Sequence, residues 1–270
     1  MPMFAATATE PLDAAARRLE RLQPSFGFVT SAGGDGWTTL ADAAADPGVV
    51  AAWLDRLDDA AGGHRNVAAS YLVLRLTGRV GTAPLASYLT EGRGLPLDPS
   101  TTHVHLDDAE FDRLALTGGS IDDGIGAADM ARRLHAVLAP VIDAVAGLAP
   151  YGVRTMWNSV ADRLGGPAVL TANAAGLDPD ETWQRARAVV DELVALGAPV
   201  RRRPRLLHVP WSGGVAAGSV KGTCCLKYVV DDLRPRDARQ QPAAFCGGCP
   251  YVDDEVRVAK RRAALERRPS

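Results

Sequence analysis

All four cysteines of this chain lie between positions 224 and 249, and none precedes them. They form a vicinal pair, Cys224-Cys225, and a C-x-x-C motif, Cys246-Gly-Gly-Cys249, which twenty residues separate. Four ordinary core thiols would have no reason to gather in one segment, so the grouping indicates a shared chemical role. Four thiolates are the ligand set of an iron–sulfur cluster and also of a structural zinc site. The fold is therefore expected to bring these two short segments together.

Length and composition limit the remaining possibilities. A chain of 270 residues with an apolar share of 47% can bury a substantial core, as one large domain or two smaller ones. A net charge of −2 argues against a dedicated nucleic-acid binder. The sequence shows no secretory signal and no long uncharged apolar stretch, so we expect no membrane span and a cytoplasmic location. Structural disulfides are rare in that reducing compartment.

Apolar periodicity predicts an α+β fold that is mostly helical. The strongest helix signal follows Asp178, a good N-cap, with Pro179 at the first helical position and Glu181 placed as in a capping box. Pro140 is expected to kink or divide the helix that contains it. Helices are predicted at 11–22, 39–45, 49–57, 66–76, 84–89, 130–145, 153–164 and 179–196, with a short terminal helix at 255–268.

Short apolar runs at 95–97, 104–106 and 111–116 are bounded by Asp, Pro, Ser and Gly, which predicts a small antiparallel sheet or hairpin. The sequence then divides into two parts. Residues 1–200 are predicted to form a mainly helical domain. Residues 201–270 are predicted to form a C-terminal iron–sulfur module that packs on it and ends in a basic tail.

The spacing of the cysteines favours some kinds of site over others, and three are considered: a thioredoxin-type redox site, a zinc site and an iron–sulfur cluster. A thioredoxin-type C-x-x-C belongs to a βαβ setting, and no such pattern surrounds Cys246 and Cys249. Zinc sites usually pair two chelating loops, whereas adjacent residues such as Cys224 and Cys225 point in opposite directions in extended chain. A two-iron cluster accepts a vicinal pair more easily if the backbone bends there or if the two thiolates serve different irons. The residues therefore favour iron–sulfur over zinc, and a zinc-stabilised interaction module stays as the alternative.

The same residues resemble a known family. The segment Gly222-Thr-Cys-Cys-Leu-Lys-Tyr228, followed by Cys246-Gly-Gly-Cys-Pro250, is similar to the C-terminal signature of the FhuF-like ferric siderophore reductases. That resemblance implies a [2Fe-2S] cluster on Cys224, Cys225, Cys246 and Cys249, with no catalytic residue beyond the cluster. It implies an oxidoreductase that reduces iron(III) held by a hydroxamate siderophore and releases iron(II), with a ferredoxin or flavin reductase as the electron donor.

The chain departs from the family pattern in one place. The gap between the cysteine pair and the C-x-x-C is longer than the family usually has, and the segment 229–244 is rich in Asp and Arg. This composition predicts a solvated surface loop. A longer loop costs little closure entropy, about 0.6 kcal/mol per doubling of length, so the cluster is expected to tolerate it.

Four further features have both a functional and a structural interpretation. The run Arg201, Arg202, Arg203 and Arg205 would attract an acidic electron donor or is simply solvated. His103 and His105 share one side of a predicted strand but lack a third metal ligand nearby. The Gly-rich stretch 213–218 lacks a nucleotide-binding spacing and is interpreted as a turn. Trp211 is a candidate for lining a ligand surface, whereas Trp157 and Trp183 are expected in the core.

Overall fold

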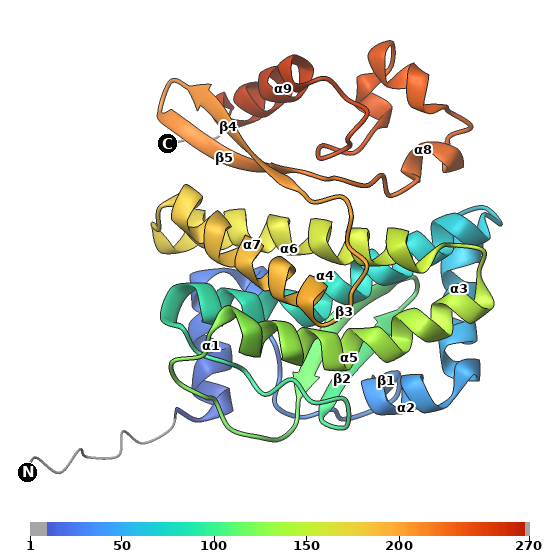
Figure 1. The fold of residues 1–270 in the computed structure, drawn as a ribbon, viewed down its shortest axis with the longest axis vertical. Coiled ribbons are helices and arrows are strands. Elements are labelled where there is room, and N and C mark those ends of the chain that lie inside the picture. Colours follow the sequence, from blue (N-terminus) through green and yellow to red (C-terminus); the bar gives the residue numbers. More distant parts are fainter. Residues whose placement is uncertain (1–9, 268–270) are drawn as a thin grey trace, which may run out of the picture.

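The computed structural model describes residues 10–267, and it has the predicted α+β class with a predominance of helix (Figure 1). Before the cysteine segment the helices are α1 (Leu12–Leu22), η1 (Pro24–Phe26), α2 (Leu40–Ala45), α3 (Pro47–Ala60), α4 (Arg65–Glu91), α5 (Ala127–Leu148), α6 (Val153–Ala175) and α7 (Pro179–Ala195). After α7 the elements are β4 (Arg205–Trp211), β5 (Gly214–Val220), α8 (Lys227–Val230), η2 (Pro235–Arg239), η3 (Pro242–Ala244) and α9 (Asp254–Glu266).

The first part also contains a small antiparallel sheet, with the strand order β1-β2-β3. Its strands are β1 (Trp37–Thr39), β2 (Thr102–Asp107) and β3 (Glu110–Leu116). Val104 pairs with Thr38 on one side and with Leu114 on the other, and the β2–β3 register shifts after His105. The predicted runs at 104–106 and 111–116 are confirmed as strands, whereas 95–97 forms none and β1 was missed because it is so short.

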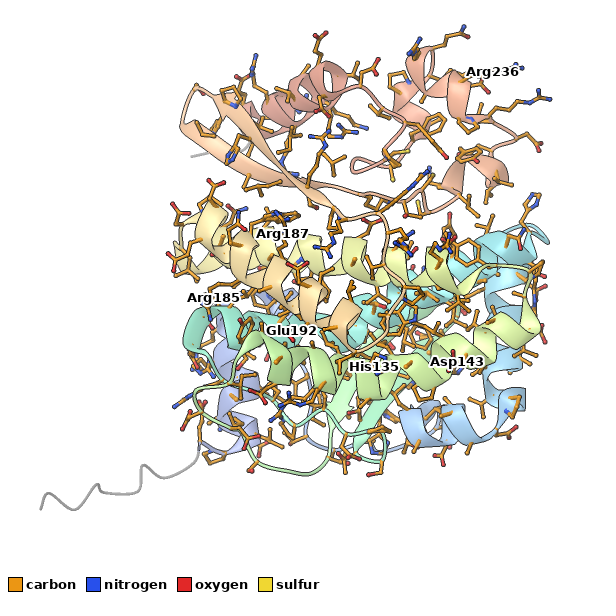
Figure 2. The ribbon with its side chains drawn as sticks, in the orientation of Figure 1. His135, Asp143, Arg185, Arg187, Glu192 and Arg236 are labelled. Atoms are coloured by element: carbon orange, nitrogen blue, oxygen red, sulfur yellow. The ribbon has the colours of Figure 1, made fainter. Side chains whose placement is uncertain are left out.

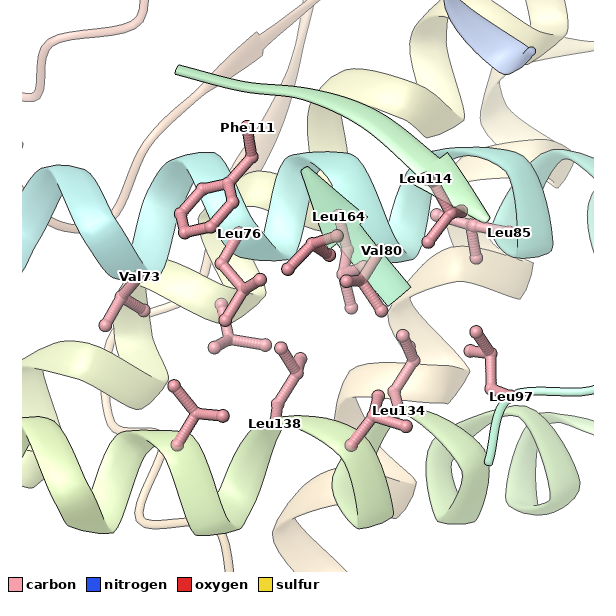
Figure 3. Packing of buried hydrophobic residues seen from close by; sticks show 14 of the residues in the cluster. Val73, Leu76, Val80, Leu85, Leu97, Phe111, Leu114, Leu134, Leu138 and Leu164 are labelled. Atoms are coloured by element: carbon pink, nitrogen blue, oxygen red, sulfur yellow. The ribbon is translucent and has the colours of Figure 1, made fainter. Parts of the chain in front are cut away.

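The principal core lies between α4, α5, α6 and the β1–β3 sheet (Figure 3). Leu76 and Val80 of α4 face Leu134 and Leu138 of α5, and Phe111 of β3 closes one side. All five side chains are buried. The core continues as far as Val200 along the chain and receives Ala217 from the later hairpin.

The prediction of two short helices at 66–76 and 84–89 is wrong, because α4 is continuous through Pro84. Gly81, between the two predicted helices, lies against α6, where a Cβ would stand 3.2 Å from Leu164 Cδ2. The packing of α4 on α6 and the other buried residues of α4 outweigh the cost of proline in a helix.

Two other predicted helices differ in extent. α6 runs to Ala175 rather than ending at 164, because Gly165 allows α6 to approach Trp183 of α7, whose ring lies 2.9 Å from where a Cβ would stand. α5 contains Pro140 without being divided. The start of α7 is confirmed, since Asp178 accepts a hydrogen bond from the Glu181 N–H at 2.8 Å.

The segment before the cysteines forms a hairpin that the sequence did not reveal. β4 and β5 pair antiparallel, with Trp211 opposite Gly214. The stretch 213–218, interpreted as a turn, is therefore mostly strand, because its glycines and alanines lack the branched side chains that usually signal one. In Figure 1 this hairpin, α8 and α9 lie on one side of the helical layer, with α6 and α7 nearest to them.

Candidate metal centre

The fold brings all four cysteines into one group. The Sγ atoms of Cys225 and Cys246 are 3.7 Å apart, and those of Cys224 and Cys249 are 4.0 Å apart. Each close pair thus joins one member of the vicinal pair to one member of the C-x-x-C motif. None of the four forms a disulfide.

The backbone bends next to the vicinal pair. Leu226 has a φ of 63° and a ψ of 10°, which is left-handed backbone for a residue with a Cβ. Such a conformation costs about 1–2 kcal/mol. The second motif turns as well, since Cys249 N–H donates to the Cys246 carbonyl at 2.9 Å, and Lys221 N–H, at the end of β5, donates to the Gly248 carbonyl at 2.9 Å.

Side chains of α4 and α6 hydrogen-bond the backbone around the vicinal pair. The buried carboxylate of Asp162 accepts hydrogen bonds from the backbone N–H of Gly222 at 2.6 Å and of Thr223 at 2.8 Å. Ser70 of α4, also buried, donates its hydroxyl to the Cys225 carbonyl at 3.2 Å. Burial raises the pKa of Asp162 to about 7, against the opposing effect of the two N–H donors. These contacts were not predicted, because a lone Asp on an apolar helix gives no sequence signal of its partner.

A second residue of α6 fixes the chain that leads to the hairpin. Asn158, one turn before Asp162, accepts hydrogen bonds through Oδ1 from the backbone N–H groups of Arg201 and Arg202, at 2.8 and 3.0 Å. This backbone lies directly against Gly222. A Cβ on Gly222 would stand 2.7 Å from the Arg203 carbonyl oxygen, so only glycine fits there without displacement.

Helix α9 supports the C-x-x-C motif. The buried Arg257 donates through Nη2 to the carbonyls of Cys249 at 2.6 Å and Val252 at 2.7 Å. Its Nη1 contacts Asp254. The terminal helix was expected to be only a charged tail, and the structure shows that one of its arginines fixes the loop of Cys249.

Cys224 and Cys249 lie in a small apolar cluster. Ala238, Phe245 and Val252 are buried around them, and Tyr228 packs on the outside. Ala238 belongs to the segment 229–244, which was expected to be a solvated loop. Its charged residues are mostly exposed, but the segment forms α8, η2 and η3 and covers one side of the cysteine group.

Cys225 and Cys246 face the opposite way, into a cavity of about 610 Å³. The cavity walls come from α4, α6, the end of β5 and α9, so it lies between the helical part and the C-terminal elements. Tyr71 of α4 and Lys221, which directly follows β5, line the cavity beside the two thiols. The two close sulfur pairs therefore have different neighbours: Cys224 and Cys249 belong to the apolar cluster, whereas Cys225 and Cys246 line the cavity.

The contacts between the sulfurs lower the pKa values of two of the four thiols and raise those of the other two. Hydrogen bonding with Cys224 and Cys246 lowers the pKa of Cys249 to about 3, and contacts with the same two residues lower the pKa of Cys225. The pKa values of Cys224 and Cys246 are raised by the reverse of these contacts and by burial. Each close pair therefore contains one thiol whose pKa is lowered and one whose pKa is raised, and metal binding would release the protons that remain on the thiols.

The donor set and its spacing fit a thiolate-bound metal centre. Two sulfurs bound at about 2.3 Å to one tetrahedral ion lie about 3.8 Å apart. Both close pairs, at 3.7 and 4.0 Å, agree with that separation. Over residues 10–267, no group of three or more His, Cys, Asp or Glu side chains is arranged around a single ion. Cys224 also contacts Cys225, and Cys246 also contacts Cys249, so the four sulfurs form one group whose spacing fits thiolate ligation of a metal centre.

The other predicted site residues lie elsewhere. His103 Nε2 contacts Thr117 Oγ1 at 3.0 Å, and His105 Nδ1 contacts Asp112 Oδ1 at 2.7 Å, within the β1–β3 sheet. Trp211, at the hairpin end, is absent from the residues that line the cavity, so its candidacy as a ligand surface is not supported. Trp157 and Trp183 are buried, as expected.

The arginine run divides in the structure. Arg203 forms an ion pair with Asp191, and Arg205 with Asp254. Arg201 and Arg202 are exposed, although their backbone is fixed by Asn158. The run thus lies beside the centre, and two of its side chains have internal partners.

Comparison with known proteins adds no relative. Neither the scan against protein-family models nor the search of curated proteins found a match. Within the part of the chain that the structure describes, no helix has the length and apolar character needed to cross a membrane.

Proposed function

We propose that this protein is a cytoplasmic ferric siderophore reductase that carries a [2Fe-2S] cluster on Cys224, Cys225, Cys246 and Cys249. One observation carries the proposal: the four thiols lie in one group, and the close pair of Cys225 and Cys246 lines a cavity of about 610 Å³. The resemblance of the cysteine motifs to the FhuF-like reductases supports the choice of substrate. The reaction transfers one electron to iron(III) in the siderophore, which becomes iron(II).

When bound, a [2Fe-2S] cluster supplies one-electron chemistry at a potential that its surroundings adjust. Iron(II) carries less charge than iron(III) and binds hard oxygen donors more weakly, so the siderophore releases it after reduction. The protein must therefore hold the cluster, admit the ferric complex on one side and exclude water from the other.

The described residues suit these tasks. Asp162, Ser70 and Arg257 fix the backbone of both cysteine segments from three different helices. The cluster of Ala238, Phe245 and Val252 packs around Cys224 and Cys249. Lys221 is placed to hydrogen-bond Cys225 and Cys246; burial lowers its pKa, but the negative charge of these sulfurs outweighs burial and raises it overall. A cation there favours the more negative, reduced state of the centre.

The electron donor in this proposal is a ferredoxin or a flavin reductase. The exposed Arg201 and Arg202, close to the cysteine segment along the surface, are available to attract an acidic protein.

The proposal is tested by mixing anaerobically reduced protein with ferric siderophores of several classes. Reoxidation is followed through the visible absorption of the cluster, and a ferrous chelator traps the product. We expect iron(II) to form in step with reoxidation, one per electron lost. A protein that stays reduced with every siderophore class would contradict the proposal.

The same sulfur separations also suit zinc, so a non-enzymatic protein with a zinc-stabilised C-terminal module is the second candidate. Metal content separates the two candidates directly.

A further inference from the structure

The cavity beside Cys225 and Cys246 has an unbalanced charge. Its lining contains a single carboxylate, Asp162, and burial raises the pKa of that group to about 7. Seven cationic side chains line the same cavity: Arg75, Arg163, Lys221, Lys227, Arg257, Lys260 and Arg261. Apart from its two thiols, the cavity lining therefore carries an excess of positive charge.

Several of these cations have internal partners. Arg75 pairs with Glu110 at 3.1 Å, Lys227 with Asp231 at 3.7 Å, and Arg257 is held by Asp254. Arg163 and Lys260 differ, since within residues 10–267 neither has a carboxylate oxygen within 4.0 Å. Both side chains are exposed. They stand on opposite walls, Arg163 on α6 and Lys260 on α9.

The positive region extends beyond this cavity. A neighbouring hollow of about 470 Å³ shares Arg75, Arg163 and Arg261 with it and adds Arg79. Glu110 is the one acidic residue in its lining. The guanidinium of Arg261 lies over Gly218, where a Cβ would stand 3.0 Å from Nη1. The two hollows together form a basic groove that ends at the cysteine pair.

The size and lining of the cavity suit a small molecule rather than a protein. Ligand pockets typically enclose about 300–1,000 Å³ and combine apolar walls with a few polar groups. Tyr71, Leu74, Phe245 and Val256 supply apolar wall area here. Cations are also needed on physical grounds, because thiolate-bound iron is itself negative and would repel an anion that approaches it without compensating charge.

Ferric chelates differ in charge according to their donors. Three hydroxamates neutralise iron(III), whereas three catecholates, or several carboxylates and hydroxylates, leave the complex negative. We propose that this cavity binds the ferric chelate beside Cys225 and Cys246 and selects chelates with net negative charge, of the catecholate or hydroxycarboxylate class. This inference rests on the proposed function, and it departs from the hydroxamate substrate that the family resemblance implies.

Binding is tested without electron transfer by using gallium(III), which is not reduced under these conditions. The two probes are a trianionic gallium tris-catecholate and a neutral gallium trihydroxamate, titrated calorimetrically into the cluster-loaded protein. We expect the trianionic complex to bind at least about tenfold more tightly at low salt, with the preference shrinking as ionic strength rises. Equal affinity for the two complexes would overturn the inference.

Two substitutions on opposite walls locate the site. Arg163→Gln and Lys260→Gln should each weaken trianion binding about five- to tenfold and leave the binding of the neutral complex within about twofold. Both side chains are exposed, so folding should be preserved, and the visible spectrum checks this. The matched control is Arg236→Gln, on η2 away from the groove (Figure 2), which should change neither affinity.

The remaining outcomes separate this inference from the proposed function. Selective gallium binding without reduction of any ferric siderophore would support the anion site and remove the reductase function. Reduction of neutral and anionic ferric complexes at equal rates, with equal gallium affinities, would keep the reductase and overturn the anion site. A loss of electron input from an acidic donor protein in Arg163→Gln, with unchanged gallium binding, would also overturn it and assign the groove to the donor.

Discussion

The helical part of the molecule and the cysteine-bearing part are held together by different forces. The helical part has one continuous apolar core, in which Leu76, Leu134 and Leu164 are almost completely buried. Within residues 10–267, the C-terminal elements have two small apolar clusters of their own, one around Cys224 and Cys249 and one under the hairpin at Val209, and they add Ala217 to the main core. Chains that bury so little apolar surface usually depend on metal ligation or another cross-link for stability. The comparison indicates that the helical part serves as a scaffold and that the cysteine segments depend on it and on their metal.

The contacts between the two parts support this division of roles. They include hydrogen bonds from side chains of the scaffold to the backbone of the other part, through Asn158, Asp162 and Ser70, beside the apolar contact of Ala217 with the main core. Such contacts fix geometry at specific points, which a metal centre requires.

The largest effect should come from removing the metal. Treating the reduced protein with a strong chelator should expose the backbone amides between 221 and 252, because the two small clusters alone bury too little to hold that segment. Hydrogen exchange should accelerate there by at least about a hundredfold, while α4 and α6 change little. Equal loss of protection in both parts would contradict the conclusion that only the cysteine-bearing part depends on the metal.

Shortening a core leucine should affect the whole molecule. Leu76→Ala removes a side chain that is 2% exposed and should lower the free energy of unfolding by about 3 kcal/mol in urea titrations. Val215→Ala, at a side chain that is 64% exposed, is the control and should cost less than about 0.5 kcal/mol. A small cost for Leu76→Ala would show that the scaffold does not depend on its core.

Asp162, which connects the helical part to the cysteine segment, should make the free energy of unfolding depend on pH. Its pKa is raised from 3.8 to about 7 in the folded state, so the folded form holds its proton more tightly than the unfolded form. The free energy of unfolding should therefore fall as pH rises, by about 2–3 kcal/mol between pH 5 and 8. Asp162→Asn should remove most of this slope. An identical slope in the variant would mean that another group titrates.

Crowding at Gly222 should test how tightly the parts are joined. Gly222→Ala places a Cβ 2.7 Å from the Arg203 carbonyl oxygen and should cost about 2 kcal/mol, with a perturbed visible spectrum. Gly147→Ala in α5, where no atom lies within 4 Å, is the matched control and should be neutral or slightly stabilising. If both variants behave alike, the packing around Gly222 is looser than described.

The sequence was a good guide where a local pattern carried the information. The cap at Asp178 and the strands around Val104 and Leu114 were predicted because capping and apolar runs are local signals. It failed where a distant contact decides the outcome. α4 runs through Pro84, and α6 continues past Gly165, which packs against Trp183, because contacts with other helices decide how far each helix extends.

The candidate site shows the same limit. Its four cysteines are visible in the sequence because their types and grouping carry the signal. The contact of Cys225 with Cys246 could not be predicted, since it depends on how two separate segments meet in three dimensions. Asp162 and Arg257 were missed because their partners are backbone groups, which leave no signature in the sequence. Asp162 binds Thr223, which is far away along the chain, and Arg257 binds Cys249.

Metal analysis combined with spectroscopy of anaerobically purified protein shows whether Cys224, Cys225, Cys246 and Cys249 hold a two-iron cluster. We expect a red-brown protein with iron and acid-labile sulfide in equal amounts, which dithionite bleaches with the appearance of an EPR signal and which Cys225→Ser strongly alters. A colourless protein with stoichiometric zinc and no iron would contradict this expectation.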